Sequence, residues 1–351
     1  MAPPRRPRWL ILLTIVTLLA GSAFLVTQRY TSHLYALAPG SAPPVQQSIS
    51  IKLPGQVHGH KGQILLVTVA LRTVQPLSYL ADRLNHEVQI VDQRALVGTA
   101  KPSQLNQANQ VAMTDSTQTA VIVALQRLGY TVNQQNLGAQ VTEVVAGTPA
   151  DGHLQPGDVI TALDGTPTPT NTALVSALGT RHAGDVVKLT VKSGTRTRIE
   201  SVKLALSAPG QGPPRPFVGI ATTTRTDATL PFDVTIDPGN IGGPSAGLAF
   251  TLGVIDELSA GDLTGGRTIA ATGTIEADGS VGDVGGVVQK TAAVRRAGAV
   301  AFLVPPGEYA DAVKHAGSKL KVIKVTSLEQ ALNALKSLGG DLSGLKPAPT
   351  T

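Results

Sequence analysis

The hydrophobic positions of the chain form one long run near the start and many short runs afterwards. From Trp9 to Val26 about 18 residues carry no charge, which is enough to cross most of a bilayer core. The short apolar run Ile64–Val69 predicts a buried strand, and Gln104–Leu128 predicts a helix. Between Tyr130 and Leu206 short β-type runs alternate with turns, and after Val218 strands alternate with helices. This pattern predicts a multidomain α/β protein.

Two stretches rich in Pro and Gly divide the chain, because neither helix nor strand tolerates such runs. They are Ala38–Pro44 and Ala208–Pro214. These stretches and the hydrophobic pattern predict five parts. The first two are a cytoplasmic tip with a transmembrane anchor (residues 1–30) and a membrane-proximal α+β region (31–128). They are followed by a β-rich domain with helices (129–208), an α+β domain (215–340) and a flexible tail (341–351).

The first apolar run is predicted to be a transmembrane helix or a signal sequence. Arg5, Arg6 and Arg8 precede it, so the positive-inside rule places the N-terminus in the cytoplasm and the later domains outside the cell membrane. The alternative is a cleaved signal peptide, because Ala20–Ala23 offers the small residues that a signal peptidase accepts. Both interpretations make the bulk of the protein extracytoplasmic.

Composition and charge exclude several classes of protein. The chain has no cysteine, which excludes a disulfide framework, a zinc finger and a thiol nucleophile. The net charge of +6 does not indicate nucleic acid binding, because four of these charges are arginines before Tyr30 and no basic stripe with aromatics follows. No H-E-x-x-H pattern occurs among the histidines, so we predict no metal and no cofactor.

The region after Tyr130 carries a recognisable series of turns and strands. Thr148-Pro149-Ala150 is followed by Leu154-Gln155-Pro156-Gly157-Asp158-Val159-Ile160 and then by Asp164-Gly165. This series resembles the core of a bacterial PDZ domain. Such domains bind an extended peptide by adding it as a strand to a sheet edge beside a helix. The resemblance places the peptide edge at Leu137, Gly138, Ala139, Gln140 and Val141. The alternative is a PDZ domain that packs against its neighbour and binds nothing.

Two clusters in the last domain can carry chemistry. Small residues and Pro244 before an apolar run predict a helix that starts at about Pro244–Ser245, which places a serine hydroxyl beside free backbone N–H groups. A serine there is most often a simple helix cap. In the second cluster Lys290 lies in the first turn of a predicted helix, where the dipole disfavours a cation; burial would lower its pKa. A lysine on an exposed helix face is the alternative.

Together these clusters resemble the proteolytic domain of Lon-type serine-lysine endopeptidases over roughly residues 217–338. The motifs are G-P-S-A-G at Gly243–Gly247, T-G-x-I at Thr272–Ile275 and G-G-V-x-x-K at Gly285–Lys290. The resemblance implies that Ser245 is the nucleophile, Lys290 its general base and Thr272 a residue that positions the lysine. The supporting loop positions are Gly243, Pro244 and Ala246.

The order of anchor, PDZ domain and Lon-type domain resembles the membrane-anchored Lon-like proteases of Gram-positive bacteria. The resemblance implies cleavage of polypeptide substrates by acyl transfer, and a homo-oligomer, because Lon-type domains commonly form rings. Two departures put the opening and closing of the site in doubt: Gly242 and Thr274 stand where many Lon enzymes have acidic residues. No complete G-x-x-x-x-G-K-[ST] motif occurs, so ATP is not an expected partner.

Two rival functions stay open. Gly243–Gly247 also satisfies G-x-S-x-G, the nucleophile elbow of α/β-hydrolases, with His315 as the downstream histidine. The acids that could complete that triad are Asp256, Asp262, Asp278, Asp283 and Asp311. An elbow needs a strand that runs directly into the serine, whereas Asp237–Gly243 reads as a loop. The second rival is a non-catalytic PDZ adaptor or scaffold.

Overall fold

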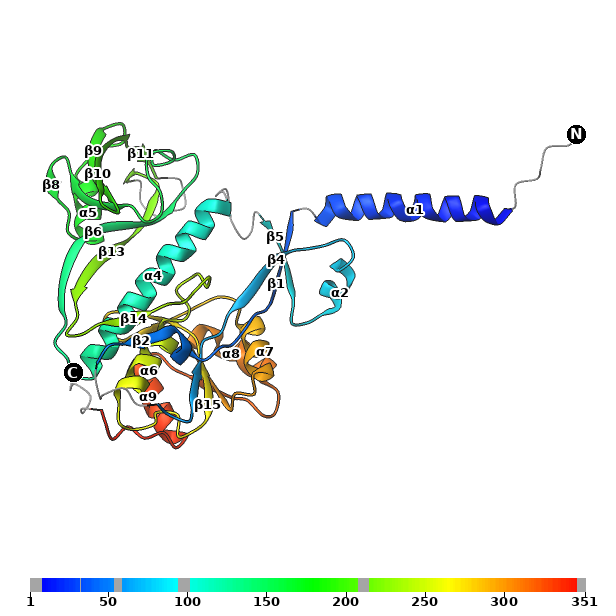
Figure 1. The fold of residues 1–351 in the computed structure, drawn as a ribbon. Coiled ribbons are helices and arrows are strands. Elements are labelled where there is room, and N and C mark those ends of the chain that lie inside the picture. The colour runs from blue at the N-terminus through cyan, green and yellow to red at the C-terminus, as the bar shows by residue number, and fades with distance from the viewer. Residues whose placement is uncertain (1–7, 32, 54–58, 94–101, 208–214, 346–351) are drawn as a thin grey trace, which may run out of the picture.

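The computed structural model describes residues 8–31, 33–53, 59–93, 102–207 and 215–345. Figure 1 shows a long N-terminal helix that projects from a small sheet, a larger body and an upper β-rich unit. The helices are α1 (Arg8–Thr31), α2 (Tyr79–Leu84), α4 (Pro102–Arg127), α5 (Asn171–Gly179), α6 (Gly247–Leu258), α7 (Val287–Arg296), α8 (Pro306–Ala316) and α9 (Leu328–Ser337), with a 3-10 turn η1 (Val45–Ser48).

The strands fall into three groups by position in the chain. Those before α4 are β1 (Leu34–Pro39), β2 (Ile49–Ile51), β3 (Gln63–Leu65), β4 (Val69–Thr73) and β5 (Gln89–Asp92). Those of the middle region are β6 (Asn133–Val144), β7 (Val159–Leu163), β8 (Thr166–Pro167), β9 (Val186–Ser193), β10 (Arg196–Lys203) and β11 (Ala205–Leu206). The others are β12 (Pro216–Phe217), β13 (Ile220–Thr229), β14 (Val234–Ile236), β15 (Thr268–Ala271), β16 (Thr274–Ile275), β17 (Val281–Gly282), β18 (Ala301–Val304) and β19 (Lys321–Lys324).

The body is built around a parallel four-stranded sheet in the order β19-β18-β15-β3. Successive residues of β18 point to opposite faces, so Leu303 joins one core with α4, α6 and α9, while Phe302 joins another with α7 and α8. All four residues of β18 are buried. Burial on both faces explains why β18 is continuously apolar rather than alternating.

The residues before the middle region belong to this same body. Strand β3 pairs in parallel with β15, and β2 pairs antiparallel with β14. Helix α4 contributes Ala120, Leu125 and neighbouring residues to the core that contains α6. The sequence predicted a separate membrane-proximal region at residues 31–128, whereas much of it completes the body. Strand partners are chosen by long-range pairing, which local patterns along the chain do not reveal.

A small antiparallel sheet in the order β4-β1-β5 lies at the root of α1. The Tyr30 ring near the end of α1 meets the Tyr79 ring of α2 edge to face, with centroids 5.8 Å apart. The ion pair between Arg72 and Asp82 ties β4 to α2. The predicted transmembrane segment is helical in α1, but no helix among the described residues was found long and apolar enough to span a membrane.

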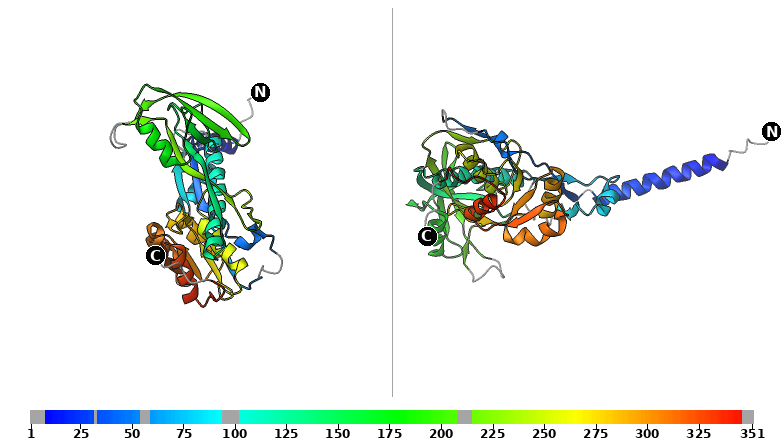
Figure 2. Two further views of the ribbon diagram at one scale, coloured as in Figure 1. Left: turned by 90° about the vertical axis from the view of Figure 1, so that its left-hand side faces the viewer. Right: turned by 90° about the horizontal axis from the view of Figure 1, so that it is seen from below.

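Strands β10, β9, β7 and β6 of the middle region form a separate antiparallel sheet with a core of its own and helix α5. Strand β13, from the segment predicted to belong to the next domain, joins this sheet beside β6. The residues predicted as a free peptide edge lie on β6, which is paired on both sides. Gln140 is opposite Val159 of β7 on one side and opposite Thr223 of β13 on the other. The expected edge therefore differs from the structure, because a later strand of the same chain satisfies its backbone groups. Figure 2 shows β6 and β13 as a long ribbon.

Candidate active site

The serine lies in the loop that leads into α6. Helix α6 begins at Gly247 with Ala246 as its N-cap, so Ser245 precedes the first helical residue instead of starting the helix as the sequence predicted. The Gly247 N–H donates to the Pro244 carbonyl at 3.3 Å, which closes a turn around the serine. The Ser245 carbonyl accepts from the Gly273 N–H at 3.0 Å and from Thr272 Oγ1 at 3.1 Å. These bonds fix the backbone of a half-buried serine.

The lysine lies in the first turn of α7. Gly286 caps this helix in the left-handed conformation with φ 71°, and its carbonyl accepts from the Lys290 N–H at 2.9 Å. A Cβ on Gly286 would lie 2.7 Å from Val69 Cγ2 of β4, so glycine is needed for both backbone and space. The Lys290 side chain is buried, with 3% exposed, and its amine donates to Thr272 Oγ1 at 3.2 Å.

Burial makes the neutral form of Lys290 more populated than it is in a solvent-exposed lysine. Burial lowers the pKa of Lys290 to about 8, and the nearby Glu308 carboxylate acts in the opposite direction. Burial raises the pKa of Glu308 as well, while a bond from the Val284 N–H at 2.8 Å lowers it. The other carboxylate oxygen of Glu308, Oε2, is buried without a hydrogen-bond partner. A lysine with a pKa near 8 has a substantial neutral fraction at physiological pH and can serve as a base.

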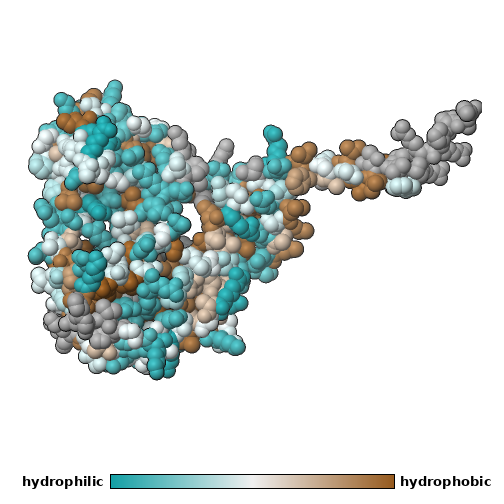
Figure 3. Space-filling view, viewed as in Figure 1, coloured by the Kyte–Doolittle hydropathy of each residue, from teal (hydrophilic) through white to brown (hydrophobic). Residues whose placement is uncertain are grey.

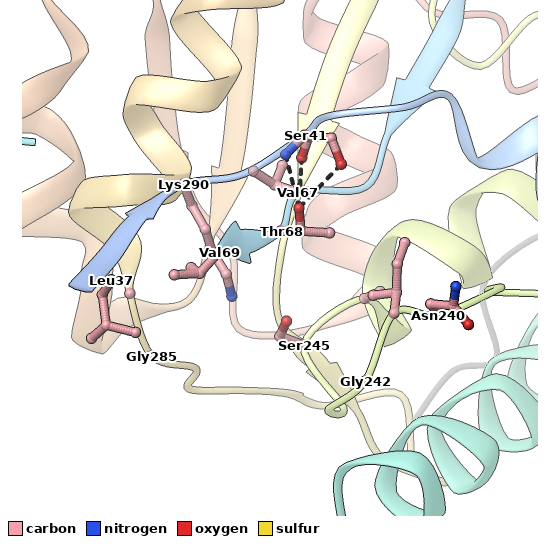
Figure 4. Close-up of a pocket in the computed structure, with 13 residues that line it drawn as sticks. Leu37, Ser41, Val67, Thr68, Val69, Asn240, Gly242, Ser245, Gly285 and Lys290 are labelled. Carbon is pink, nitrogen blue, oxygen red and sulfur yellow. Dashed lines mark hydrogen bonds between the residues drawn. The ribbon is translucent and has the colours of Figure 1, made fainter. Parts of the chain in front are cut away.

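Ser245 and Lys290 line one cavity of about 490 Å³. Figure 4 shows the lysine amine and the serine hydroxyl pointing into it from different elements. The other lining residues are Leu37, Ser41, Val67, Thr68, Val69, Asn240, Ile241, Gly242, Ala246, Gly285 and Gly286. The structure thus brings the two predicted catalytic residues together and places Thr272 against both. Among the described contacts, the lysine amine bonds to Thr272 and not to the Ser245 hydroxyl.

The supporting loop positions are held by α4. The Gly243 N–H donates to the Asn109 carbonyl at 2.8 Å, and Ser116 Oγ donates to the Pro244 carbonyl at 3.0 Å. Gly243 has φ 88°, and Ala246 is buried with 2% exposed. A Cβ on Gly242 would come within 3.0 Å of Asn109 Cβ. Gly242, which stands where many Lon enzymes have an acidic residue, therefore lies where the serine loop is in close contact with α4.

Sequence reasoning missed the part of the cavity that comes from the N-terminal region. Leu37 of β1, Ser41 and the segment Val67–Val69 form one wall of the cavity. Ser41 and Thr68 are joined by hydrogen bonds, including one from the Ser41 N–H to Thr68 Oγ1 at 2.9 Å. The apolar pattern predicted a buried strand at Ile64–Val69 but gave no sign of its partner, so its contribution to the site could not be found.

The residues of the rival hydrolase triad are not assembled around Ser245. His315 lies on α8, where its Nδ1 contacts the Asp311 carbonyl of the same helix at 2.8 Å. Asp256 is buried in α6 and accepts from the Leu263 N–H at 3.0 Å. Neither residue lines the cavity that contains the serine. This geometry favours the lysine as the base.

Comparison with known families gives two matches. Residues 126–204 match the PDZ domain model, and residues 230–337 match the Lon protease (S16) C-terminal proteolytic domain model. The chain therefore carries a PDZ domain followed by a Lon-type proteolytic domain, which confirms these two parts of the sequence-based resemblance. The proteolytic domain belongs to a family of serine peptidases.

Individual relatives are distant or cover part of the chain. Lon protease 2 of Bacillus subtilis is 30% identical over 121 residues, which are 33% of this chain and 21% of that protein. The PDZ domain of the SdrC-like protein of Listeria monocytogenes is 27% identical and covers 24% of this chain and 87% of that structure, with a TM-score of 0.23. Its Listeria innocua counterpart is 30% identical, with coverages of 24% and 92% and a TM-score of 0.22.

Proposed function

We propose that this protein is an ATP-independent serine endopeptidase with Ser245 as nucleophile and Lys290 as general base. The observation that carries the proposal is the shared cavity in which a buried lysine, with its pKa lowered to about 8, points toward the same space as the serine hydroxyl. Thr272 contacts both residues through one hydroxyl. The Lon-type match over residues 230–337 supports a peptidase rather than an unrelated hydrolase.

The mechanism follows from the protonation states. Neutral Lys290 takes the proton of Ser245 Oγ while that oxygen attacks a peptide carbonyl, and the resulting ammonium then gives the proton to the leaving amine. The Gly247 and Leu248 N–H groups at the start of α6 already donate to the Pro244 and Gly273 carbonyls, so the backbone N–H groups of Ser245 and Ala246 are the ones proposed to hold the oxyanion. Water, activated by Lys290, then hydrolyses the acyl-enzyme. Among the described contacts the Lys290 amine bonds to Thr272 and not to Ser245 Oγ, and we expect its bond to Ser245 Oγ to form when substrate binds, as catalytic hydrogen bonds often do.

The substrates proposed are flexible or exposed polypeptide segments. The chain has no complete phosphate-binding motif of the Walker type, so it offers no means of unfolding a substrate with ATP. A segment that already lacks stable structure can reach the cavity without being unfolded first.

The test is cleavage of casein by the purified protein without ATP. Wild type is compared with Ser245→Ala, Lys290→Ala and His315→Ala. We expect the first two variants to be inactive and the third to match wild type. Loss in Ser245→Ala and His315→Ala with activity retained in Lys290→Ala would indicate a hydrolase triad. No cleavage by folded wild type, together with no labelling by a serine-directed fluorophosphonate, would favour the adaptor.

Membrane anchoring through the N-terminal helix is proposed as part of this function. The support is the uncharged run from Trp9 to Val26 and the exposed apolar side chains of α1, among them Leu18, Leu25 and Val26. Figure 3 shows hydrophobic surface along the described part of this projecting helix. We expect the full chain to stay in the membrane fraction after carbonate washing and a chain starting at residue 31 to be released. Release of both would exclude the anchor.

A further inference from the structure

The PDZ domain has a groove between β6 and α5, where domains of this kind add an extended peptide as a further strand. In this protein β13 already lies there, antiparallel to β6, with Thr222 opposite Val141 and Thr224 opposite Ala139. The family match ends at residue 204, before β13 begins at Ile220. The strand in the groove therefore comes from the segment that leads to the proteolytic domain, as Figure 1 shows.

The contacts of β13 with α5 are specific for a hydroxyl. The Asn171 backbone N–H, at the first residue of α5, donates to Thr224 Oγ1 at 3.2 Å, and Thr224 Oγ1 donates to Asn171 Oδ1 at 2.8 Å. Asn171 Nδ2 also donates to the Thr222 carbonyl at 3.4 Å. One residue of α5 thus contacts both the side chain and the backbone of the strand. β-branched threonines also favour the extended conformation that the groove requires.

We propose that β13 is an internal ligand of the PDZ groove, held through Thr224 and Asn171, and that an external extended peptide with a hydroxyl residue at the matching position competes with it. The partner is thus an unstructured polypeptide with Ser or Thr at the position that matches Thr224. An internal strand has a high effective concentration, so the groove is open for only a fraction of the time. The apparent Kd for an external peptide is its intrinsic Kd divided by that fraction.

The two-stranded ribbon of β6 and β13 is divided into a part that lies in the groove, up to Arg225, and a part that lies outside it, from Thr226. A register shift separates Arg225 from Thr226. Next to this boundary α4 holds β13, since Arg225 pairs with Asp115 at 2.8 Å and Gln118 Nε2 donates to the Thr226 carbonyl at 2.9 Å. Opening therefore concerns the segment Ile220–Thr224. Arg225 and Thr226 stay anchored to α4 after it, and the Val218 and Gly219 carbonyls accept backbone hydrogen bonds from the PDZ domain before it.

The experiment measures peptide binding and not catalysis, so its outcome is independent of the proposed protease activity. The full chain in mild detergent carries Ser245→Ala to prevent cleavage of the probe. The probe is a fluorescein-labelled synthetic peptide with the sequence of residues 218–229, measured by fluorescence anisotropy. Thr224→Val removes the hydroxyl from the internal strand, and Thr223→Val is the matched control, because Thr223 is exposed on the same strand.

We expect Thr224→Val to bind the probe about five to ten times more tightly than the parent, because the internal competitor has lost its hydroxyl contacts with Asn171. Thr223→Val is expected to bind like the parent. A probe with valine at the position of Thr224 is expected to show no gain. Equal affinities for the parent and Thr224→Val, or no binding by a folded Thr224→Val protein, would overturn the proposal.

A second measurement uses the absence of native cysteine. Ala221 of β13 lies opposite Glu143 of β6 before this boundary, and both side chains are exposed, so Glu143→Cys with Ala221→Cys places one engineered pair in a chain that otherwise has no cysteine. In the Thr224→Val background we expect the oxidised pair to weaken probe binding and reductant to restore it within the same sample. Binding that is insensitive to reductant, although the disulfide has formed, would contradict displacement of β13.

Discussion

The amine of Lys290 donates a hydrogen bond to Thr272 Oγ1 at 3.2 Å, in the wall of the cavity that also contains Ser245. The single proton of this hydroxyl is directed to the Ser245 carbonyl at 3.1 Å, so the threonine oxygen has to accept from the lysine. A neutral lysine that donates one proton in this direction keeps its lone pair free for another partner. Thr272 therefore orients the proposed base without occupying it.

The first prediction concerns the pH dependence of cleavage. Burial lowers the pKa of Lys290 to about 8, and the neutral amine is the proposed base. As the pH falls below this value the amine becomes protonated, so kcat/KM should fall about tenfold per pH unit below 8 and level off above it. Initial rates with a labelled casein between pH 6 and 9.5 measure this profile. A flat profile over that range would contradict the role of Lys290.

The second prediction tests the influence of Glu308 on that profile. Its carboxylate raises the pKa of Lys290, so Glu308→Gln should move the acidic limb of the profile to lower pH. Glutamine keeps an oxygen that can accept from the Val284 N–H. Asp311→Asn on the exposed side of the same helix is the control and should leave the midpoint unchanged. An unchanged or higher midpoint in Glu308→Gln would argue against this electrostatic coupling.

The third prediction concerns Thr272. Thr272→Val keeps the shape of this fully buried side chain but removes the acceptor that orients Lys290. We expect kcat to fall about ten- to hundredfold with a smaller change in KM, because orientation of the base affects the chemical step. Thr272→Ser restores the hydroxyl and should recover most of kcat. Melting temperatures of both variants show whether a loss of folding explains the result instead.

The fourth prediction concerns the hold of α4 on the serine loop. Ser116→Ala removes the bond to the Pro244 carbonyl, beside the proposed nucleophile. We expect about a fivefold lower kcat/KM, which corresponds to loss of roughly one hydrogen bond in the reacting geometry. Thr114→Ala, whose hydroxyl is exposed and bonds to the backbone of its own helix, should retain wild-type activity. Equal activities of the two variants would show that this contact does not position Ser245.

The motifs that carry the resemblance to Lon-type endopeptidases are local, because each depends on short-range backbone geometry. The turn before α6, the left-handed Gly286 before α7 and the motif around Thr272 each depend on residues close together in the chain. The resemblance of these three motifs to Lon-type endopeptidases implied that Ser245, Lys290 and Thr272 belong to one site, whereas each motif alone also fitted a structural role. The predicted helix start at Pro244–Ser245 was too early, because α6 begins at Gly247 and Ser245 lies in the preceding turn.

The N-terminal wall of the cavity and the state of the PDZ groove were decided by contacts between distant parts of the chain. Val69 reaches Gly286 through the small β4-β1-β5 sheet, and Ser116 reaches Pro244 through the packing of α4. No pattern near Gly138–Val141 indicates that Thr222–Arg225 will cover this segment. The backbone N–H and C=O groups at the edge of a strand are the same in every sequence, so they can pair with any other strand. The sequence of a strand therefore does not identify its partner.

The sequence by itself determined the two kinds of domain, and the resemblance of its short motifs to Lon-type endopeptidases implied the proposed nucleophile, the base and the residue between them. Such motifs can be recognised because each one lies within a few consecutive residues. Tertiary structure alone decided that the region before the PDZ domain completes the proteolytic body and that β13 fills the groove of β6. It also decided the depth of burial that lowers the pKa of Lys290. Pairing and desolvation depend on which surfaces meet in space, and that information is spread over the whole chain.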